Sequence, residues 1–259
     1  MIKMNSKAIK FSIAACLILL IVAVSGVASA YSISAQADEK QLEIINEIYG
    51  QDMTQGEFWE MVFPEEYALM KKNLSDEEFK EFCSTEKYWG DDYQELPYGA
   101  NVWDKNGPVS LASLTEEQKS SYGLENLKTD NSGYIIQGSN SEASYLVDKL
   151  CTLLDSKSAL VLYADNLGRS GSSITYSGSG KVSGYTTSTS LTLTVELYGD
   201  DSRVAYVERY GKKGETVTAS SAHASPRTGV LYQSKVTGTS TNPSLSGYTW
   251  SPARQWPFS

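Results

Sequence analysis

The run from residue 190 to 198 alternates strictly between apolar and polar side chains. The apolar members are Leu191, Leu193, Val195 and Leu197, and the polar members between them are Thr192, Thr194, Glu196 and Tyr198. A period of two places the apolar set on one face of a β-strand and the polar set on the other. This run therefore predicts a strand that has one face in a hydrophobic core.

Further strand-like runs follow, and turn signals separate them. We expect strands over residues 203–210, 216–224, 230–236 and 247–250, with a hairpin turn at 199–201. Residues 170–190 are rich in Ser, Thr and Gly, and we interpret them as two strands joined by a turn at 178–180. A flexible linker is the alternative. Residues 251–259 are not expected to continue a ladder.

Three of these stretches resemble a known fold family. Residues 178–184 (GSGKVSG), 190–198 (SLTLTVELY) and 225–232 (SPRTGVLY) are similar to the immunoglobulin-like β-sandwich of small exported bacterial proteins. The resemblance covers residues 172–250, and it implies two packed antiparallel sheets. It carries no catalytic motif, so it implies no activity.

The region before this sandwich has helical signals. Asp38 is a candidate N-cap, and Thr54/Glu57 and Ser75/Glu78 have the spacing of capping boxes. Residues 142–155 form the strongest amphipathic pattern. We therefore expect an α+β fold with a small α-helical N-terminal part followed by an antiparallel immunoglobulin-like β-sandwich. The expected segments are 1–30 (signal peptide), 31–137 (acidic and mainly helical), 138–169 (amphipathic helix and connector) and 170–259 (β-sandwich).

The first thirty residues have the pattern of an export signal. Three lysines precede an apolar run over residues 11–24, and Ala28-Ser29-Ala30 is a small-x-small cleavage site. An uncleaved membrane anchor is the alternative, because a span needs about 17–25 residues. The prediction is a secreted or cell-surface protein that meets a membrane only through this segment, if it stays uncleaved.

Charge is distributed unevenly along the chain. Residues 31–137 hold 8 basic and 22 acidic residues, whereas residues 138–259 hold 11 basic and 9 acidic ones. Nucleic acid would be repelled by the acidic part, so it is excluded as a partner. A glycan or a protein surface is compatible with this charge.

Two cysteines lie outside the signal segment, Cys83 and Cys151. An oxidising compartment would permit a disulfide between them, and two buried thiols are the alternative. The chain contains a single histidine, His223, which limits histidine-based catalysis and zinc binding. In a strand-like run this histidine is expected to be structural.

Residues 88–103 are the candidate binding segment. They combine large aromatic rings with carboxylates and have no regular period, and the predicted binding residues are Trp89, Asp91, Asp92, Tyr93, Glu95 and Trp103. Tyrosine and tryptophan often anchor recognition surfaces, especially in loops. The alternative is a local aromatic core that includes Trp89 and Trp103.

No motif for catalysis or for cofactor binding is complete in this sequence. The serine-elbow pattern and the phosphate-binding glycine loop are both unfinished. Calcium is compatible with the carboxylates of residues 91–95 or with Asp104 and Asn106, but neither matches the twelve-residue loop. We therefore expect a non-enzymatic interaction or adhesion module. The alternatives are an exported hydrolase acting on glycan or peptide and a secreted toxin-like factor.

Overall fold

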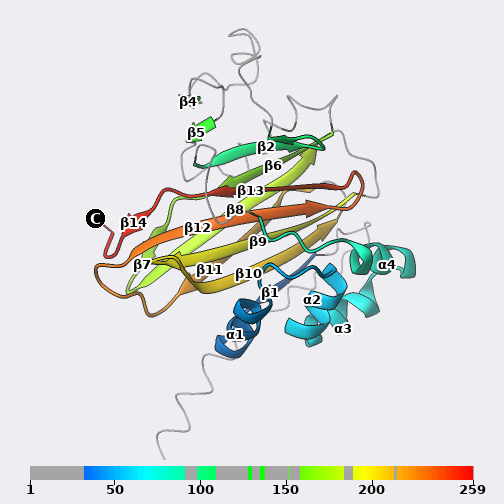
Figure 1. Ribbon diagram of the computed structural model, residues 1–259, viewed down its shortest axis with the longest axis horizontal. Coiled ribbons are helices and arrows are strands. Elements are labelled where there is room, and N and C mark those ends of the chain that lie inside the picture. The colour runs from blue at the N-terminus through cyan, green and yellow to red at the C-terminus, as the bar shows by residue number, and fades with distance from the viewer. Residues whose placement is uncertain are drawn as a thin grey trace, which may run out of the picture.

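A computed structural model describes most of the chain after the predicted signal segment (Figure 1). The described residues are 32–90, 98–108, 128–129, 135–137, 151, 158–183, 189–212 and 215–258. Within these ranges the chain forms four short helices and two six-stranded antiparallel sheets, together with one two-stranded ladder. None of the helices in these ranges is long and apolar enough to cross a membrane.

The first sheet is built on the alternating run of residue 190 onward. Its strand order is β1 (Ser32–Gln36), β10 (Ser202–Lys212), β9 (Ser190–Gly199), β12 (Leu231–Ser240) and β13 (Leu245–Trp250), and β14 (Arg254–Gln255) also pairs with β12. The β9–β10 hairpin turns at residues 200–201, as expected from the sequence.

The second sheet packs against the inner face of the first. Its order is β11 (Val217–His223), β8 (Ser173–Ser183), β6 (Ala159–Ala164), β2 (Ala100–Asp104) and β3 (Gly107–Pro108), with β7 (Gly168–Ser170) also on β8. The separate ladder joins β4 (Lys128–Thr129) to β5 (Ile135–Gln137). One hydrophobic cluster draws on both sheets, so the architecture is sandwich-like.

The apolar face of β9 lies in this shared core, as the period of two predicts. Leu193, Val195 and Leu197 are fully buried, and they belong to the same cluster as Leu160 and Leu162 of β6. Burial of each such side chain stabilises the fold by roughly 1.5–3 kcal/mol.

Residues 173–183 form one continuous strand, so the predicted turn at 178–180 is wrong. The reason lies in the opposite sheet. A β-carbon on Gly180 would lie 2.9 Å from Leu193 Cδ1, and one on Gly178 would collide with Val236. These glycines let the two sheets approach closely, and they do not turn the chain.

Both ends of the part of the chain described after residue 31 also pair where no strand was expected. β1 runs antiparallel to β10 with Ala35 opposite Glu208, and Ala35 is fully buried. At the other end, Arg254 and Gln255 pair with β12. Residues on both sides of position 137 thus enter the same sheets, and the expected segment boundaries stay a prediction.

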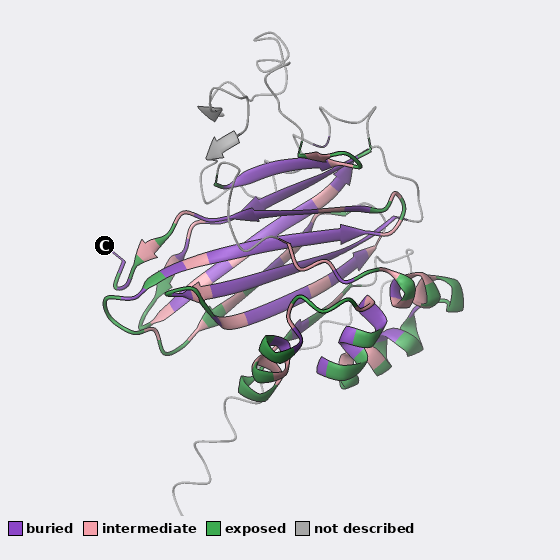
Figure 2. Ribbon diagram, in the orientation of Figure 1, coloured by how far each residue is buried: buried purple, intermediate pink, exposed green. Residues whose placement is uncertain are grey.

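The four helices lie on the outer face of the first sheet, over β1 and β10 (Figures 1 and 2). They are α1 (Glu39–Ile48), α2 (Gln55–Val62), α3 (Pro64–Asn73) and α4 (Asp76–Ser84). Capping boxes begin α2 and α4, and Asp38 caps α1, as the sequence predicts; Gln41 completes a third box at α1. A second hydrophobic cluster joins the buried residues of these helices to Tyr206 and Tyr210 on the outer face of β10.

The open sides of the sandwich are closed by side chains. On one side Arg209 donates from Nη1 to the carbonyl of Thr218 at 2.8 Å. On the other, the Trp103 indole donates to the carbonyl of Tyr248 at 3.0 Å. These bonds use backbone groups at sheet edges, which would otherwise be open to pairing with another chain.

Two further expectations concern the cysteines and the amphipathic pattern. Cys83 and Cys151, both of which the structure describes, do not form the predicted disulfide. Cys83 contacts the Tyr67 hydroxyl in the helical layer, whereas Cys151 contacts the carbonyl of Lys181 in β8. The two thiols therefore lie against different elements. The helix expected over 142–155 falls outside the described residues, apart from Cys151.

Candidate functional site

The polar face of the first sheet is buried where the helices and the segment that follows α4 lie over it. Glu208 is fully buried on this face, and Lys87, which follows α4, reaches its Oε2 atom with Nζ at 2.5 Å. The Trp59 indole donates to Oε1 at 2.6 Å, and the hydroxyls of Thr194 and Tyr206 donate to Oε2. Every charge in this cluster is compensated, as burial of an ion requires.

A second buried ion pair lies nearer the β9–β10 turn. Arg203 Nε donates to Glu196 Oε1 at 2.5 Å, and its side chain is 5 % exposed. Its Nη1 donates to Asn46 Oδ1 at 2.8 Å, and its Nη2 donates to the Tyr198 hydroxyl at 2.9 Å. The guanidinium carbon also lies 4.0 Å from the centre of the Tyr49 ring. One side chain thus joins α1 to two strands.

Burial and neighbouring groups both shift the pKa values here. Burial disfavours the charged guanidinium, but Glu196 together with the hydroxyls of Tyr198 and Tyr49 outweighs this and raises the pKa of Arg203 above its ordinary value. The pKa of the Tyr198 hydroxyl is also raised, chiefly by burial and then by Glu196. Both groups therefore keep their ordinary protonation state, a cation and a neutral phenol, throughout the physiological pH range.

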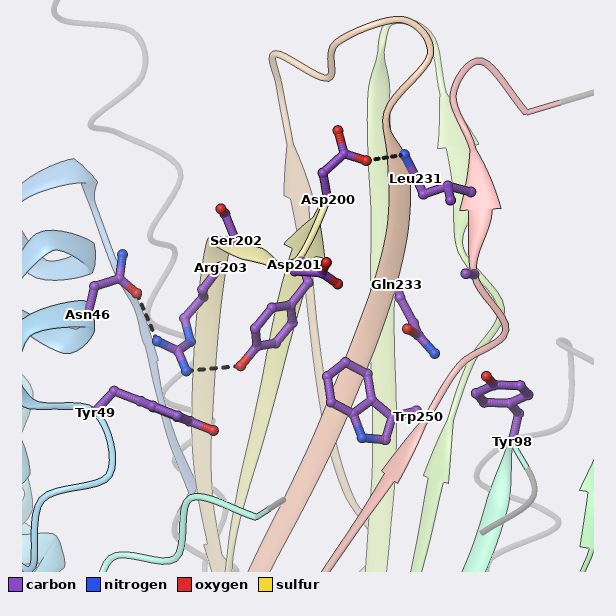
Figure 3. Close-up of a pocket in the computed structure, with 12 residues that line it drawn as sticks. Asn46, Tyr49, Tyr98, Asp200, Asp201, Ser202, Arg203, Leu231, Gln233 and Trp250 are labelled. Carbon is purple, nitrogen blue, oxygen red and sulfur yellow. Dashed lines mark hydrogen bonds between the residues drawn. The ribbon is translucent and has the colours of Figure 1, made fainter. Parts of the chain in front are cut away.

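Beside this pair the surface opens into a cleft of about 910 Å³ (Figure 3). Four aromatic residues line it, and they come from four separate parts of the chain: Tyr49 after α1, Tyr98 before β2, Tyr198 on β9 and Trp250 on β13. The polar lining residues are Asn46, Asp200, Asp201, Ser202, Arg203 and Gln233. The cleft therefore lies at the seam between the helical layer and the first sheet.

The rim of the cleft is the β9–β10 turn. Asp200 and Asp201 both have positive φ, 46° and 64°, a conformation in which glycine or asparagine is favoured. The Asp200 backbone bonds the carbonyl of Leu231, and the Leu231 amide donates to Asp200 Oδ1 at 3.1 Å. These reciprocal bonds hold the turn against β12 and keep two exposed carboxylates at the rim.

Exposed apolar side chains gather at the same place. Among the described residues the large hydrophobic side chains that stay exposed are Met61, Leu69, Tyr98 and Leu231. Tyr98 is 41 % exposed and Leu231 is 52 % exposed, and both line the cleft. Apolar groups next to a polar rim are typical of ligand-binding surfaces.

The structure places the predicted binding residues in different surroundings. Trp103 is buried against Gly247 and Tyr248. Trp89 is half-buried; its ring lies 5.0 Å from that of Tyr49, and its indole donates to the carbonyl of Gln51. Trp103 therefore packs inside the protein, whereas Trp89 packs on the Tyr49 ring and keeps part of its surface exposed.

The remaining predicted binding residues, Asp91, Asp92, Tyr93 and Glu95, lie outside the described residues, so this segment stays a prediction. The described residues on either side of this segment are Gly90 and Tyr98. A β-carbon on Gly90 would lie 2.8–3.1 Å from side-chain atoms of Thr237, Lys235 and Tyr248, and Tyr98 lines the cleft.

Metal and histidine chemistry find little support in the described residues. No group of three or more His, Cys, Asp or Glu side chains comes together in them as a metal site would require. The Asp104 carboxylate accepts a hydrogen bond from the Asn106 amide at 2.7 Å and so shapes the β2–β3 turn. His223 is in β11, opposite Ile174, and its ring lies 6.1 Å from that of Tyr232; burial lowers its pKa.

Sequence reasoning did not identify the cleft, although Tyr98 lies within the segment that it selected. Two signals in the sequence point toward this region. One is the Asp-Asp pair in a two-residue hairpin turn where glycine would be favoured. The other is Glu196 and Lys235, charged residues placed within strands that otherwise read as sandwich strands.

Comparisons with known proteins give limited information. No family model matches the chain, and no curated protein matches it. Solved structures of Bacteroides uniformis beta-glucuronidase match weakly. One is a calcium-binding mutant of beta-glucuronidase 2, at 20 % identity and a TM-score of 0.26, over 34 % of this chain and 12 % of that one.

A second match is beta-glucuronidase 2 covalently bound to cyclophellitol-6-carboxylate aziridine, at a TM-score of 0.25, over 35 % of this chain and 12 % of that one. Since this chain covers so little of those enzymes and the scores are so low, the likeness assigns neither an activity nor a ligand.

Proposed function

We propose that this protein is an exported, non-enzymatic binding module whose cleft receives a sugar ring of a glycan. The observation that carries the proposal is the lining of the cleft, where four aromatic residues lie beside two rim carboxylates and the amide of Gln233. Aromatic faces pack on the apolar faces of sugar rings, and carboxylate and amide groups bond the hydroxyls around them. The proposal takes the paired sheets as an immunoglobulin-like scaffold.

The charge of the cleft suggests which glycans it favours. The Arg203 charge is compensated by Glu196 at 2.5 Å, whereas Asp200 and Asp201 are exposed at the rim. A ligand at the rim therefore meets negative charge, and an anionic sugar would be repelled at low ionic strength. Neutral or amine-bearing sugars are the proposed class.

Export supports the same role. A signal pattern in residues 1–30 would deliver the module to the cell surface or the medium, where glycans are abundant. The rim carboxylates are adjacent residues of one tight turn, whereas glycoside hydrolysis needs two carboxyl groups on opposite sides of the scissile bond. This arrangement is the reason for proposing binding rather than hydrolysis.

The experiment is calorimetric titration of the mature protein with three oligosaccharide probes of matched length. They are a neutral chito-oligosaccharide, its de-N-acetylated amine form, and an oligosaccharide that contains glucuronate. We expect the first two to bind and the third to bind at least about tenfold more weakly at low salt, which is about 1.4 kcal/mol. Binding of none of the three, or release of reducing ends from any of them, would contradict the proposal.

A matched pair of variants localises the site. Leu231 and Met61 are both 52 % exposed, but only Leu231 lines the cleft. Leu231→Ser should weaken binding several-fold and Met61→Ser should leave it unchanged. Equal effects of the two substitutions would place the ligand elsewhere.

A further inference from the structure

The C-terminal turn of α1 forms one wall of the cleft, and two polar contacts link it to the first sheet. Asn46 accepts the Nη1 bond of Arg203 at 2.8 Å, and the Tyr49 hydroxyl accepts a bond from Lys235 Nζ at 2.8 Å. The Tyr49 ring also lies under the Arg203 guanidinium, 4.0 Å from its carbon. Both cations belong to the first sheet, and both lie beside Glu196.

We infer that the Arg203–Glu196 pair is the joint that docks α1 onto the sheet and thereby assembles the cleft. This inference rests on the proposed function only in that the cleft binds a ligand. Arg203 and Glu196 then act as positioning residues: they hold Asn46 and Tyr49 opposite Tyr198, and the ligand meets the lining that results. A ligand that contacts Tyr49 favours the docked helix, so its binding and the docking of α1 stabilise each other.

The length of α1 makes it dependent on tertiary contacts. α1 has ten residues, fewer than an isolated helix needs to be stable in water. Its buried side chains are Ile45 and Ile48, which contact the second hydrophobic cluster. The apolar contact holds one face of α1, whereas the hydrogen bonds of the Arg203 guanidinium set where the last turn of α1 lies relative to the cleft.

Arginine is suited to this task in a way that lysine is not. The planar guanidinium donates to Glu196, Asn46 and Tyr198 at the same time and presents its face to Tyr49. A lysine ammonium is a single point charge and cannot serve these four groups together. Arg203→Lys should therefore keep the positive charge and lose the simultaneous hydrogen bonds to Glu196, Asn46 and Tyr198.

The Lys87–Glu208 ion pair provides a matched comparison. Lys87 and Glu208 also join the helical layer to the first sheet, but their helix contacts are to Phe58 and Trp59 of α2. Neither residue lines the cleft. Loss of this pair should loosen α2, and loss of the Arg203 pair should loosen α1.

Native-state hydrogen exchange, read by mass spectrometry of peptides, tests this without any ligand. In Arg203→Lys we expect the amides of α1 to exchange several-fold faster relative to those of α2, and in Lys87→Met we expect the amides of α2 to exchange several-fold faster relative to those of α1. An equal rise in both helices for both variants would overturn the inference.

Asn46→Ala offers a milder test that keeps the protein folded. Alanine has the higher helix propensity, so propensity alone would slow exchange in α1. Loss of the bond to Arg203 should instead speed it, whereas Glu47→Ala, at the neighbouring exposed position of the same helix, should not. If the two alanine variants exchange alike, the joint does not exist.

The chito-oligosaccharide probe separates the two proposals. If the exchange pattern is found and no probe binds, the joint stands and the proposed glycan function fails. If the probe binds without slowing exchange in α1 relative to α2, the coupling is refuted and the binding function stands.

Discussion

Removal of the Lys87 charge should destabilise the protein strongly, because Glu208 has no route to solvent. The side chains of the pair are 1 % and 0 % exposed, and Nζ lies 2.5 Å from Oε2. At an effective dielectric constant of about 20, two unit charges at this distance attract by about 6–7 kcal/mol. Burial of each ion costs several kcal/mol in lost hydration, so the intact pair contributes little net stability.

Lys87→Met keeps the length of the side chain and removes the charge. Glu208 then stays buried with three neutral donors, from Trp59, Thr194 and Tyr206. The expected loss is about 3–5 kcal/mol, the usual cost of breaking a buried pair from one side. For a chain of this size that corresponds to a fall in Tm of roughly 6–20 °C.

The assay is urea unfolding followed by circular dichroism, with a double-mutant cycle. Glu208→Gln alone should also destabilise, whereas Lys87→Met with Glu208→Gln should cost much less than the sum of the single changes. Lys80→Met, which removes an exposed lysine of α4, serves as the control and should change stability by less than about 0.5 kcal/mol. A loss below about 1 kcal/mol in Lys87→Met, or additive single effects, would refute the reasoning.

Three further predictions concern the sheet core, the rim and an ion pair. Gly178→Ala places a methyl group against Val236 and 3.1 Å from the Tyr163 carbonyl oxygen. Thermal unfolding should therefore show a loss of stability of about 1–3 kcal/mol. An unchanged Tm would mean that the sheets are farther apart. Asp201→Gly relieves a positive φ and should raise stability by about 1 kcal/mol while weakening any glycan binding, and lower stability would contradict this. The hydrogen bond from Lys212 lowers the pKa of Glu78 to about 2. The stabilising contribution of the Glu78 carboxylate is therefore complete above the ordinary pKa of 4.5 and is lost as pH falls from there toward 2. Acid unfolding of Glu78→Gln should lack that part of the pH dependence.

The local pattern of the sequence was sufficient to predict which face of a strand is buried and where helices start. The period of two in residues 190–198 selects the side chains that enter the core, since alternate residues of a strand point to opposite faces. The hydroxyl–carboxylate spacing of Thr54/Glu57 and Ser75/Glu78 marks the first turns of α2 and α4, because those bonds close within three residues. Such features depend only on neighbours along the chain.

The same local reasoning failed where a distant segment decided the outcome. The glycines at 178 and 180 favour a turn when considered alone, but the opposite sheet needs the space above them. The short N-terminal run of residues 32–36 has no strong pattern, yet β10 offers it an unpaired edge.

The candidate site belongs mainly to this second category. Nothing local shows that the polar face of β9 is covered, because Glu196 and Thr194 alternate as solvent-facing residues would. Lys87 is 121 residues away from Glu208, and the cleft unites side chains from residues 46 to 253. Only the tertiary structure brings these groups together, since the pairing of buried charges depends on which helix lies over which strand, and a periodic pattern carries no information about that.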